Sequence, residues 1–280
     1  MLAPVEAAAN PRVRCRQIVE SDLDSLAEIL AQGFPTRARG YWEAGFKRLA
    51  ALPPIEGIPP FGYALESDHG IVGVLLTISS QRGDRIISNV SSWYVHPSYR
   101  THSMMLVSMA TKLKHVIYLN VSPAPHTRPT LQAAGWKPYN FGRSAAFPVL
   151  RLGGGRVREA IPADLSERAL LEDHRAWGCV SLVCEKEGTL SPFVFKPRRL
   201  ARPPLPMMEL IYCRATSEFE RCGAALGRYF LRRGCPGFIV DGKVSEMLSH
   251  YAPDKEPRLY KGPCTPELND LAYTEKVIFG

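Results

Sequence analysis

The order of structural signals in the first half of this chain recurs in the second half. In both halves an arginine, Arg16 or Arg158, stands six residues before an Asp-Leu pair. A strand, a turn at a glycine and another strand follow in each half, about Gly70 and about Gly188. Signals that recur at long spacing indicate repeated structural units. The sequence therefore predicts a tandem duplication whose second copy has diverged, with an unrelated C-terminal α/β domain as the alternative.

A glycine-rich stretch separates the two halves. Residues 152–158 include Gly153, Gly154 and Gly155, and consecutive glycines are typical of a linker. The chain has 280 residues, whereas a domain usually has about 100 to 150, so each half is long enough to bury its own core. We expect one domain over residues 1–151 and a second, degenerate domain over residues 152–280.

Periodicity predicts alternating strands and helices in the first half. Ser21 with Asp24 three residues later is typical of a helix N-terminus, and the apolar run 71–79 is typical of a strand covered on both faces. The expected order is strand 13–19, a helix from Ser21 to Gly33, helix 37–52, a hairpin that turns at 67–70, strand 86–95, helix 103–113, strand 115–121, helix 127–134 and strand 141–150.

The second half shows a similar but shorter series. We expect two strands over 180–195 on either side of Gly188, then strand 207–213, helix 217–233 and strand 238–240. Strands and helices that alternate in this way predict the α/β (α+β) class, with tandem mixed sheets flanked by helices.

The basic charge of the chain points to no particular partner. The formal net charge is +8 and the isoelectric point is about 9.2, but the Lys and Arg residues are scattered, with their densest clusters at 198–202 and 228–233. We expect a solvated basic surface, which also suits a phosphate-bearing cofactor, in preference to nucleic-acid binding.

Cysteine usage and the N-terminus favour a cytoplasmic protein. The seven cysteines are odd in number and include no C-x-x-C pair and no His spacing typical of zinc. They predict reduced, mostly buried thiols and no metal site. No signal-peptide pattern and no apolar run of about 18 residues is present, so a cytoplasmic enzyme or binding protein is expected, without membrane insertion.

Four stretches of the first half stand out for their order and spacing: Arg16-Gln-Ile-Val-Glu-Ser-Asp-Leu, Gly70-Ile-Val-Gly-Val, Trp93-Tyr-Val-His-Pro-Ser-Tyr-Arg and Ala133-Ala-Gly-Trp. Together they resemble the GNAT superfamily of acyl-CoA N-acyltransferases, over roughly residues 13–150. In that family such stretches are the first strand and helix start, the third strand, the fourth strand with the cofactor loop, and a Gly-Phe after the fourth helix. The resemblance implies a GNAT-like acyl-CoA-binding domain, followed by a degenerate GNAT-like copy.

The resemblance also implies a site for the pyrophosphate of coenzyme A after the fourth strand. Backbone N–H groups at a helix N-terminus form a concave donor site for phosphate. The family's loop reads Arg-x-x-Gly-x-Gly or Ala, which aligns it with Arg100, Thr101, His102, Ser103, Met104 and Met105. Ser103 and Met105 stand at the two glycine positions, where side chains narrow the cradle. Tyr94 and Val95, at the end of the strand, complete the expected cofactor-binding set.

The catalytic groups of the family are not evident in this sequence. A GNAT enzyme usually positions an amine to attack the thioester, with a base near the fourth strand and a residue, often Tyr, that protonates the thiolate. Here strand 88–95 has no carboxylate, and the usual Tyr position falls on or near Leu131. Ser122 and His126, just past the fifth strand, are the candidate substitutes, since His titrates near neutral pH. A loop histidine bonded to nearby backbone is the alternative for His126.

One further carboxylate of the second half could act as a base. Glu209 lies within an apolar strand, where burial raises the pKa of an unpaired carboxyl. The alternative is a structural Glu paired with a cation. Arg221-Cys-Gly-Ala-Ala echoes the glycine loop only faintly, from inside a helix, so no phosphate site is expected there.

Taken together, the residues and the resemblance predict an acyltransferase that moves an acyl group from acyl-CoA, acetyl-CoA or a longer chain, to an amine of a small molecule. An acyl carrier protein is an alternative donor that the basic isoelectric point would suit. A non-catalytic GNAT-like module that binds a ligand or a partner protein is the competing function. The acceptor, the acyl chain and the oligomeric state, a homo-oligomer included, stay open.

Overall fold

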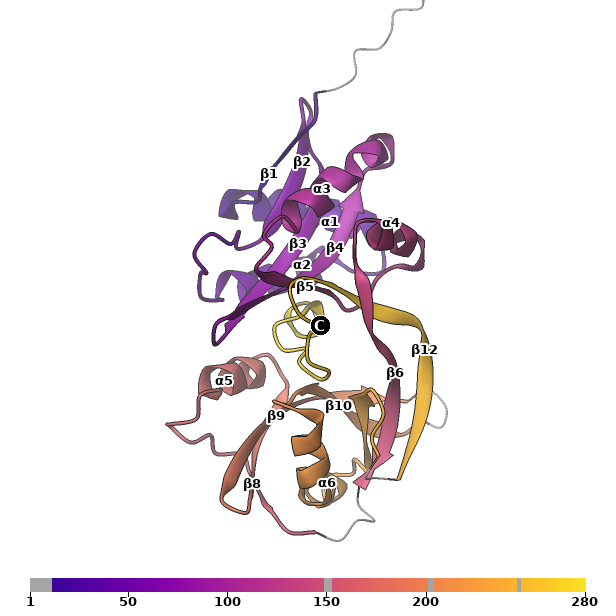
Figure 1. Ribbon diagram of the computed structural model, residues 1–280. Coiled ribbons are helices and arrows are strands. Elements are labelled where there is room, and N and C mark those ends of the chain that lie inside the picture. Colours follow the sequence, from indigo (N-terminus) through magenta and orange to yellow (C-terminus); the bar gives the residue numbers. More distant parts are fainter. Residues whose placement is uncertain (1–11, 149–152, 201–203, 246–247) are drawn as a thin grey trace, which may run out of the picture. The chain divides into compact units, whose positions relative to one another are not determined.

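The computed structural model describes residues 12–148, 153–200, 204–245 and 248–280 (Figure 1). Two compact units divide the chain: unit 1 runs to Tyr118 and includes Phe279, and unit 2 consists of Leu119–Ile278 with Gly280. Leu152, the start of the predicted linker, lies outside the described residues, and the linker's last residues form strand β7 (Arg156–Arg158). The duplication and the domains 1–151 and 152–280 stay predictions.

Unit 1 contains a sheet in the order β1–β2–β3–β4–β5. Its strands are antiparallel from β1 to β4. The elements are β1 (Arg14–Gln17), α1 (Leu23–Gly33), α2 (Arg39–Ala50), β2 (Gly62–Ser67), β3 (Gly70–Arg82), β4 (Arg85–Val95), α3 (Ser103–Ala110) and β5 (Val116–Asn120). Residues 73–78 of β3 are buried consecutively, and both α1 and α3 contact this strand. Consecutive burial requires cover on both faces, as the apolar run predicted.

The start of α1 differs from the prediction. The side chain that bonds the backbone before the helix is that of Asp22, not Ser21: Asp22 Oδ2 accepts a hydrogen bond from the Val19 N–H at 2.9 Å. The Arg16 guanidinium donates to both Asp22 oxygens, at 2.6 and 2.9 Å. Ser21 lies inside the short 3-10 turn Glu20–Asp22. The expectation of a Ser21 cap is wrong because a carboxylate already fixed by Arg16 accepts the N–H of the turn.

Helix α2 supplies an aromatic contact for the last described residues of unit 1. The Phe279 ring lies 5.5 Å from the Trp42 ring and 6.1 Å from the Phe46 ring, centroid to centroid. Gly45 makes room for it, because a Cβ at that position would lie 2.1 Å from a ring carbon of Phe279. This packing ties Phe279 to α2.

Unit 2 contains a larger sheet in the order β12–β6–β11–β10–β9–β8–β7. β10 and β11 are parallel, whereas the other neighbours are antiparallel. Its elements after β5 are α4 (Arg128–Ala133), β6 (Lys137–Phe147), β7, α5 (Arg168–Ala176), β8 (Val180–Lys186), β9 (Thr189–Arg199), β10 (Pro206–Tyr212), α6 (Thr216–Leu231), β11 (Gly237–Asp241), β12 (Leu248–Lys261) and α7 (Glu275–Ile278). The predicted α/β class, with mixed sheets flanked by helices, is confirmed.

The core of unit 2 forms between β9 and α6. Phe193 and Phe195, two residues apart on β9, point to the same face of the sheet. Two rings of α6 lie against them: Phe219 is 6.4 Å from Phe193, and Phe230 is 5.0 Å from Phe195, centroid to centroid. All four side chains are buried. Each contributes about 1.5 to 3 kcal/mol on burial, so this helix is held by its apolar face.

Two further expectations, for the cysteines and for the third helix, are tested by the structure. All seven cysteines are free, and four of them are buried, as predicted. The helix predicted over 103–113 ends earlier, at Ala110, where Thr111 leaves the helical conformation and its hydroxyl donates to the Val107 carbonyl at 2.8 Å. No helix in the described part of the chain is long and apolar enough to cross a bilayer.

Candidate functional site

A bulge interrupts β4 close to its carboxyl end. The pairing with β3 shifts between Val74 and Leu76, so that Ser92 and Trp93 together face Leu75. Ser92 has a φ of 52°, in the left-handed region. A bulge leaves backbone polar groups outside the ladder, and a non-glycine residue at positive φ stores strain of the kind often found at functional sites. The end of β4 is therefore a candidate ligand contact.

The six predicted phosphate-loop residues lie together at the next junction. Arg100, Thr101 and His102 end the 3-10 helix η2 (Pro97–His102), and α3 begins at Ser103. Arg100 is exposed, and Met105 is 37% exposed. The positive end of the α3 dipole and the Arg100 guanidinium both favour an anion here.

This junction differs from an open glycine loop. The Ser103 N–H donates to the Arg100 carbonyl, which continues η2 into α3, so this N–H is not available to a phosphate. The N-cap residue of α3 is His102, not Ser103, and the His102 side chain makes no capping hydrogen bond. The donor set at this helix start is thus smaller than glycines in the same positions would give.

Tyr94 and Val95 serve mainly the packing of unit 1. Val95 is buried, and the Tyr94 ring lies against α1, 6.4 Å from the ring of Phe34. Gly33 has to be a glycine in this arrangement, because a Cβ there would lie 2.5 Å from the Tyr94 ring. Any contact of these two residues with a ligand would have to be made mainly by their backbone.

In unit 2, the predicted Ser122 meets a carboxylate that the sequence did not single out. Ser122 is exposed just after β5, and its hydroxyl donates a hydrogen bond to Glu275 Oε1. Glu275 is the first residue of α7 and is half-buried. His126 is exposed in the 3-10 helix η3 (Pro125–Thr127), and in the described residues it makes no hydrogen bond or ion pair. The structure therefore pairs Ser122 with Glu275, not with His126.

The C-terminal part of the chain enters the sheet of unit 2. β10 and β11 stop pairing before their carboxyl ends. Beyond that point, residues 269–271 pair with β10: the Cys213 N–H donates to the Asn269 carbonyl at 3.1 Å and the Leu271 N–H donates to the Ile211 carbonyl at 2.8 Å. The crevice at the carboxyl ends of parallel strands is where open α/β sheets bind ligands. In unit 2 the chain itself occupies it.

The Asn269 side chain completes this insertion. Its Oδ1 accepts from the Asp241 N–H of β11 at 2.8 Å, and its Nδ2 donates to Thr216 Oγ1, at the start of α6, at 3.1 Å. Asn269 is fully buried and has a φ of 64°, a conformation that Asn tolerates better than most residues. One side chain thus joins β11, α6 and the inserted segment.

The arginine before α6, Arg214, is also bound by a carboxylate. Arg214 donates to both carboxylate oxygens of Glu167, at 2.6 and 2.7 Å, and to the Leu190 carbonyl at 3.0 Å. Burial would raise the Glu167 pKa, but Arg214 and Ser166 outweigh it and hold the pKa below its usual range. The Arg214 guanidinium is therefore already bound within unit 2.

Glu209 is a structural residue, not a base. It lies 4% exposed between Arg198, at 2.6 Å, and Lys276, which contacts its other oxygen. Burial alone would raise the Glu209 pKa, but the two cations outweigh it and lower the pKa to about 2. A carboxylate of that pKa is too weak a base for catalysis at neutral pH. The alternative interpretation, a structural Glu paired with a cation, is therefore the one that the structure supports.

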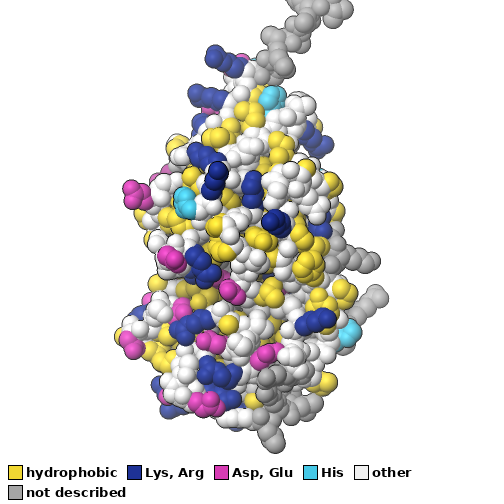
Figure 2. Space-filling view, in the orientation of Figure 1, with side chains coloured by type: hydrophobic (Ala, Val, Ile, Leu, Met, Phe, Trp, Pro, Cys, Tyr) yellow, Lys and Arg dark blue, Asp and Glu magenta, His cyan; other side chains and the backbone are white. Residues whose placement is uncertain are grey.

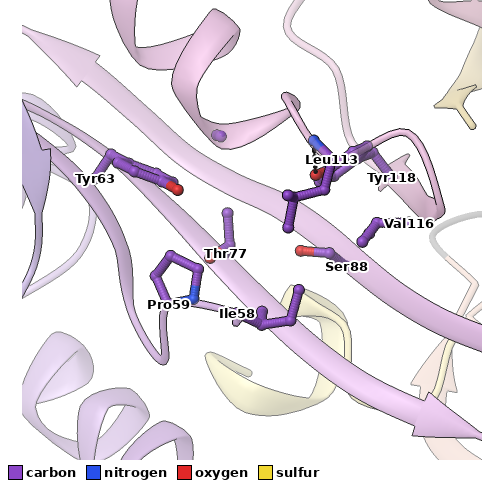
Figure 3. Close-up of a pocket in the computed structure, with 9 residues that line it drawn as sticks. Ile58, Pro59, Tyr63, Thr77, Ser88, Leu113, Val116 and Tyr118 are labelled. Atoms are coloured by element: carbon purple, nitrogen blue, oxygen red, sulfur yellow. Dashed lines mark hydrogen bonds between the residues drawn. The ribbon is translucent and has the colours of Figure 1, made fainter. Parts of the chain in front are cut away.

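A small pocket lies in unit 1 between β3, β4 and the end of α3 (Figure 3). Tyr63, Thr77 and Ser88, three residues with hydroxyl groups, are among those that line it. The Thr77 hydroxyl is buried and has no hydrogen-bond partner among the described residues. No predicted site residue of the described chain lines this pocket, and a water molecule would satisfy Thr77.

The visible face of the molecule carries mixed charge. Figure 2 shows basic side chains interspersed with acidic and apolar ones, without one continuous basic field. Among the described residues, no three His, Cys, Asp or Glu side chains gather in a way that could hold a metal ion.

Comparison with solved structures identifies the fold. The chain is similar to a putative acetyltransferase from Pyrococcus horikoshii, with 11% identity, 93% of each chain covered and a TM-score of 0.54. It is also similar to a GCN5-related N-acetyltransferase from Anabaena variabilis, with 10% identity, 89% of this chain and 72% of that one covered, and a TM-score of 0.60. This chain has the GNAT fold. A third GNAT structure, from Kribbella flavida, is 14% identical over 89% of this chain and 71% of that one, with a TM-score of 0.55.

The GNAT resemblance of the sequence is thereby confirmed for the fold. That resemblance covered only residues 13–150, whereas the structural similarity to the Pyrococcus protein extends over 93% of the chain. No protein-family model and no curated protein sequence matches.

Proposed function

We propose that this protein transfers an acyl group from acyl-CoA to an amine of a small molecule. The observation that carries the proposal is the junction of unit 1, where the bulged end of β4 leads to the N-terminus of α3 beside the exposed Arg100. Backbone groups freed by a bulge can bind an amide or thioester carbonyl, and a helix N-terminus with an arginine can bind phosphate. The six loop residues Arg100 to Met105 are the proposed cofactor-binding residues, with Tyr94 and Val95 before them.

A non-catalytic GNAT-like module is the second candidate. It is favoured by the engaged Ser103 N–H and by Met105, which stands where a glycine would open the cradle. Such a module would bind a ligand or a partner protein without turning over a thioester.

The test is a calorimetric and thermal-shift titration with acetyl-CoA, a long-chain acyl-CoA and coenzyme A alone. A ligand that binds the native state raises its stability. We expect binding by the parent protein and a loss of about tenfold or more in affinity in Arg100→Ala, because a charge-assisted bond to phosphate disappears.

Arg199→Ala is the matched control, since it removes the same charge from an exposed position at the end of β9. Equal binding by both variants would remove Arg100 from the site. Binding of no thioester by the parent would favour the non-catalytic module and leave acyl carrier proteins as the donors to examine.

A further inference from the structure

Two cysteines of unit 2 lie against each other in the core between β8 and α6. Cys184 of β8 and Cys222 of α6 are both fully buried and belong to one apolar cluster. Their thiols are joined by a hydrogen bond. Two thiols at hydrogen-bond distance need only a small movement to form a covalent bond, for which the sulfurs have to approach to about 2 Å.

A serine and an arginine complete the surroundings of this cysteine pair. Ser191 of β9 is the cross-strand neighbour of Cys184, so both side chains point to the same face of the sheet. The Ser191 hydroxyl hydrogen-bonds the Cys222 thiol and accepts from Arg221 Nη2 at 2.9 Å. Arg221 immediately precedes Cys222 on α6. Cys222 thus has a thiol, a hydroxyl and a guanidinium beside it.

These neighbours favour the ionisation of Cys222 over that of Cys184. The hydrogen bond from Cys184 is the largest influence on the Cys222 pKa and lowers it. The Ser191 hydroxyl and the Arg221 guanidinium lower this pKa further, against burial and the Glu218 carboxylate, which raise it. The same hydrogen bond, together with burial, raises the Cys184 pKa. Because the thiolate is the nucleophile in thiol chemistry, Cys222 is the attacking sulfur of the pair.

The glycine segment 153–155 lies between Cys184 and solvent. All three glycines are exposed. A Cβ on Gly155 would lie 3.5 Å from Cys184 Sγ and 3.2 Å from the Cβ of Ala225, which is one helical turn after Cys222. Gly155 has a φ of 125°, a conformation that residues with a side chain rarely adopt. Exposed glycine backbone therefore packs directly against the Cys184 sulfur.

Strand β7, which follows this segment, is the last strand in the sheet order. It has three residues and pairs with β8, with Val157 opposite Cys184. A short edge strand opens at a lower free energy than the core of a protein. Local opening of β7 and the glycine segment gives a small oxidant access to the cysteine pair without global unfolding.

We propose that Cys184 and Cys222 form a redox-active dithiol, which a hydroperoxide that enters past Gly155 oxidises to a disulfide between β8 and α6. This modification site lies wholly within unit 2 and is independent of the acyl transfer proposed above.

Two electrons pass from the two sulfurs to the peroxide. The Cys222 thiolate attacks one peroxide oxygen, the O–O bond breaks, and the leaving oxygen takes the proton that Cys222 released. This gives a sulfenic acid at Cys222 and an alcohol, or water when the oxidant is hydrogen peroxide. Cys184 then gives up its proton and attacks the Cys222 sulfur. The S–S bond forms, the S–O bond breaks, and the leaving hydroxide takes that proton to become water.

The experiment treats the reduced full chain with hydrogen peroxide and maps its thiols by alkylation, digestion and mass spectrometry. Oxidation of the exposed Cys264 shows in the same sample that the peroxide is active. We expect a cross-linked peptide pair that joins Cys184 to Cys222 and that dithiothreitol separates again. Cys235→Ser is the control, since Cys235 packs against the same cluster outside the pair, and it should keep the cross-link.

Single-thiol and glycine variants test the order of the steps and the route of entry. Cys184→Ala should leave Cys222 as a sulfenic acid that dimedone traps, whereas Cys222→Ala should abolish the oxidation of Cys184. Gly155→Ala should speed cross-linking by about fivefold or more relative to Gly154→Ala, because alanine is strained at the φ of Gly155. A Cβ on Gly154 would meet nothing within 4 Å, which makes it the matched control.

The result from the parent protein decides the proposal even where a variant fails to fold. Cys184 and Cys222 that both remain open to alkylation while Cys264 is oxidised would overturn it. So would a disulfide from either cysteine to Cys235, or a cross-link that forms only in urea, where the chain is unfolded. Equal rates of cross-linking in the two glycine variants would contradict entry past Gly155.

Discussion

The two strand-to-helix junctions of this chain have the same order of parts but different occupants. In unit 1, β4 passes through a bulge at Ser92 and reaches α3 beside the exposed Arg100. In unit 2, β10 shifts register at Ile211 and reaches α6 beside Arg214, whose guanidinium binds Glu167. The comparison shows that the arginine of the second junction is neutralised by a carboxylate of its own unit, whereas Arg100 of the first junction is exposed and has no ion-pair partner among the described residues.

A second resemblance between the units lies at their outer strands. Arg16 of β1 pairs with Glu66 of β2 at 3.2 Å, and Arg158 of β7 pairs with Glu185 of β8. The repeated arginine that the sequence showed thus has a similar partner in both units, although Asp164, the counterpart of Asp22, is exposed. The crevice of unit 2 is filled by residues 269–271, so the comparison predicts a single cofactor site per chain.

The largest expected effect comes from removing a buried carboxylate of unit 2, the unit whose crevice is filled by its own chain. Glu209→Gln leaves Arg198 and Lys276 without their buried partner. Removal of one partner of a buried ion pair costs about 3 to 5 kcal/mol, so urea unfolding should show a loss of that size. Glu20→Gln, at an exposed position, is the control and should change the free energy of unfolding by less than about 0.5 kcal/mol. Equal effects of the two variants would show that Glu209 is not buried and paired.

The pH dependence of the free energy of unfolding should also report the ion pairs of Glu209. The folded-state pKa of Glu209 is lowered to about 2 from 4.5, so its stabilising contribution is complete above pH 4.5 and is lost as pH falls toward 2. The loss should amount to about 2 to 3 kcal/mol. Thermal unfolding between pH 5 and pH 2 measures it, and Glu209→Gln should have a shallower slope over that window. Parallel slopes for parent and variant would contradict the assignment.

Loosening the inserted segment should cost less. Asn269→Gly keeps the left-handed backbone but removes the side-chain bonds to Asp241 and Thr216. Loss of these buried bonds should lower the free energy of unfolding by about 1 to 3 kcal/mol. Hydrogen exchange at the Leu271 amide should accelerate in the variant, because the bond from the Leu271 N–H to the Ile211 carbonyl then opens more often. Unchanged exchange there would mean that Asn269 does not hold the segment in place.

The smallest expected effect concerns the bulge of unit 1. Ser92→Gly relieves a positive φ and should stabilise the protein by up to about 1 kcal/mol. Ser91→Gly, next to it in the same strand, should destabilise by about 0.5 to 1 kcal/mol, since glycine weakens an extended position. Thermal unfolding compares the two variants. A loss of stability in Ser92→Gly as large as that in Ser91→Gly would show that the bulge carries no strain.

The sequence predicted the elements of the fold better than their contacts. Periodicity placed most strands and helices of the described chain, because burial imposes a period on local sequence. It missed β12 (Leu248–Lys261), whose register with β6 contains two irregularities and whose sequence includes two prolines. It also placed the α1 cap on Ser21, since a motif does not reveal that Arg16 already fixes Asp22.

The candidate site was predictable only in part. The loop Arg100 to Met105 was predicted from the resemblance to the GNAT superfamily, and the structure places it at one helix start. Glu275 could not be predicted, because it meets Ser122 from far along the chain and no local spacing records that contact. The bulge at Ser92 also left no signal, since no glycine marks the left-handed residue.

The most direct test of a single cofactor site is the stoichiometry of acetyl-CoA binding by calorimetry, with a negative charge added at either helix start. Ser103→Glu places a carboxylate at the start of α3, and Ser217→Glu places one in the first turn of α6. The account predicts one equivalent of acetyl-CoA per chain for the parent and for Ser217→Glu, and strongly weakened binding for Ser103→Glu, because the added charge repels phosphate. Two equivalents in the parent, or binding that survives in Ser103→Glu and disappears in Ser217→Glu, would contradict it.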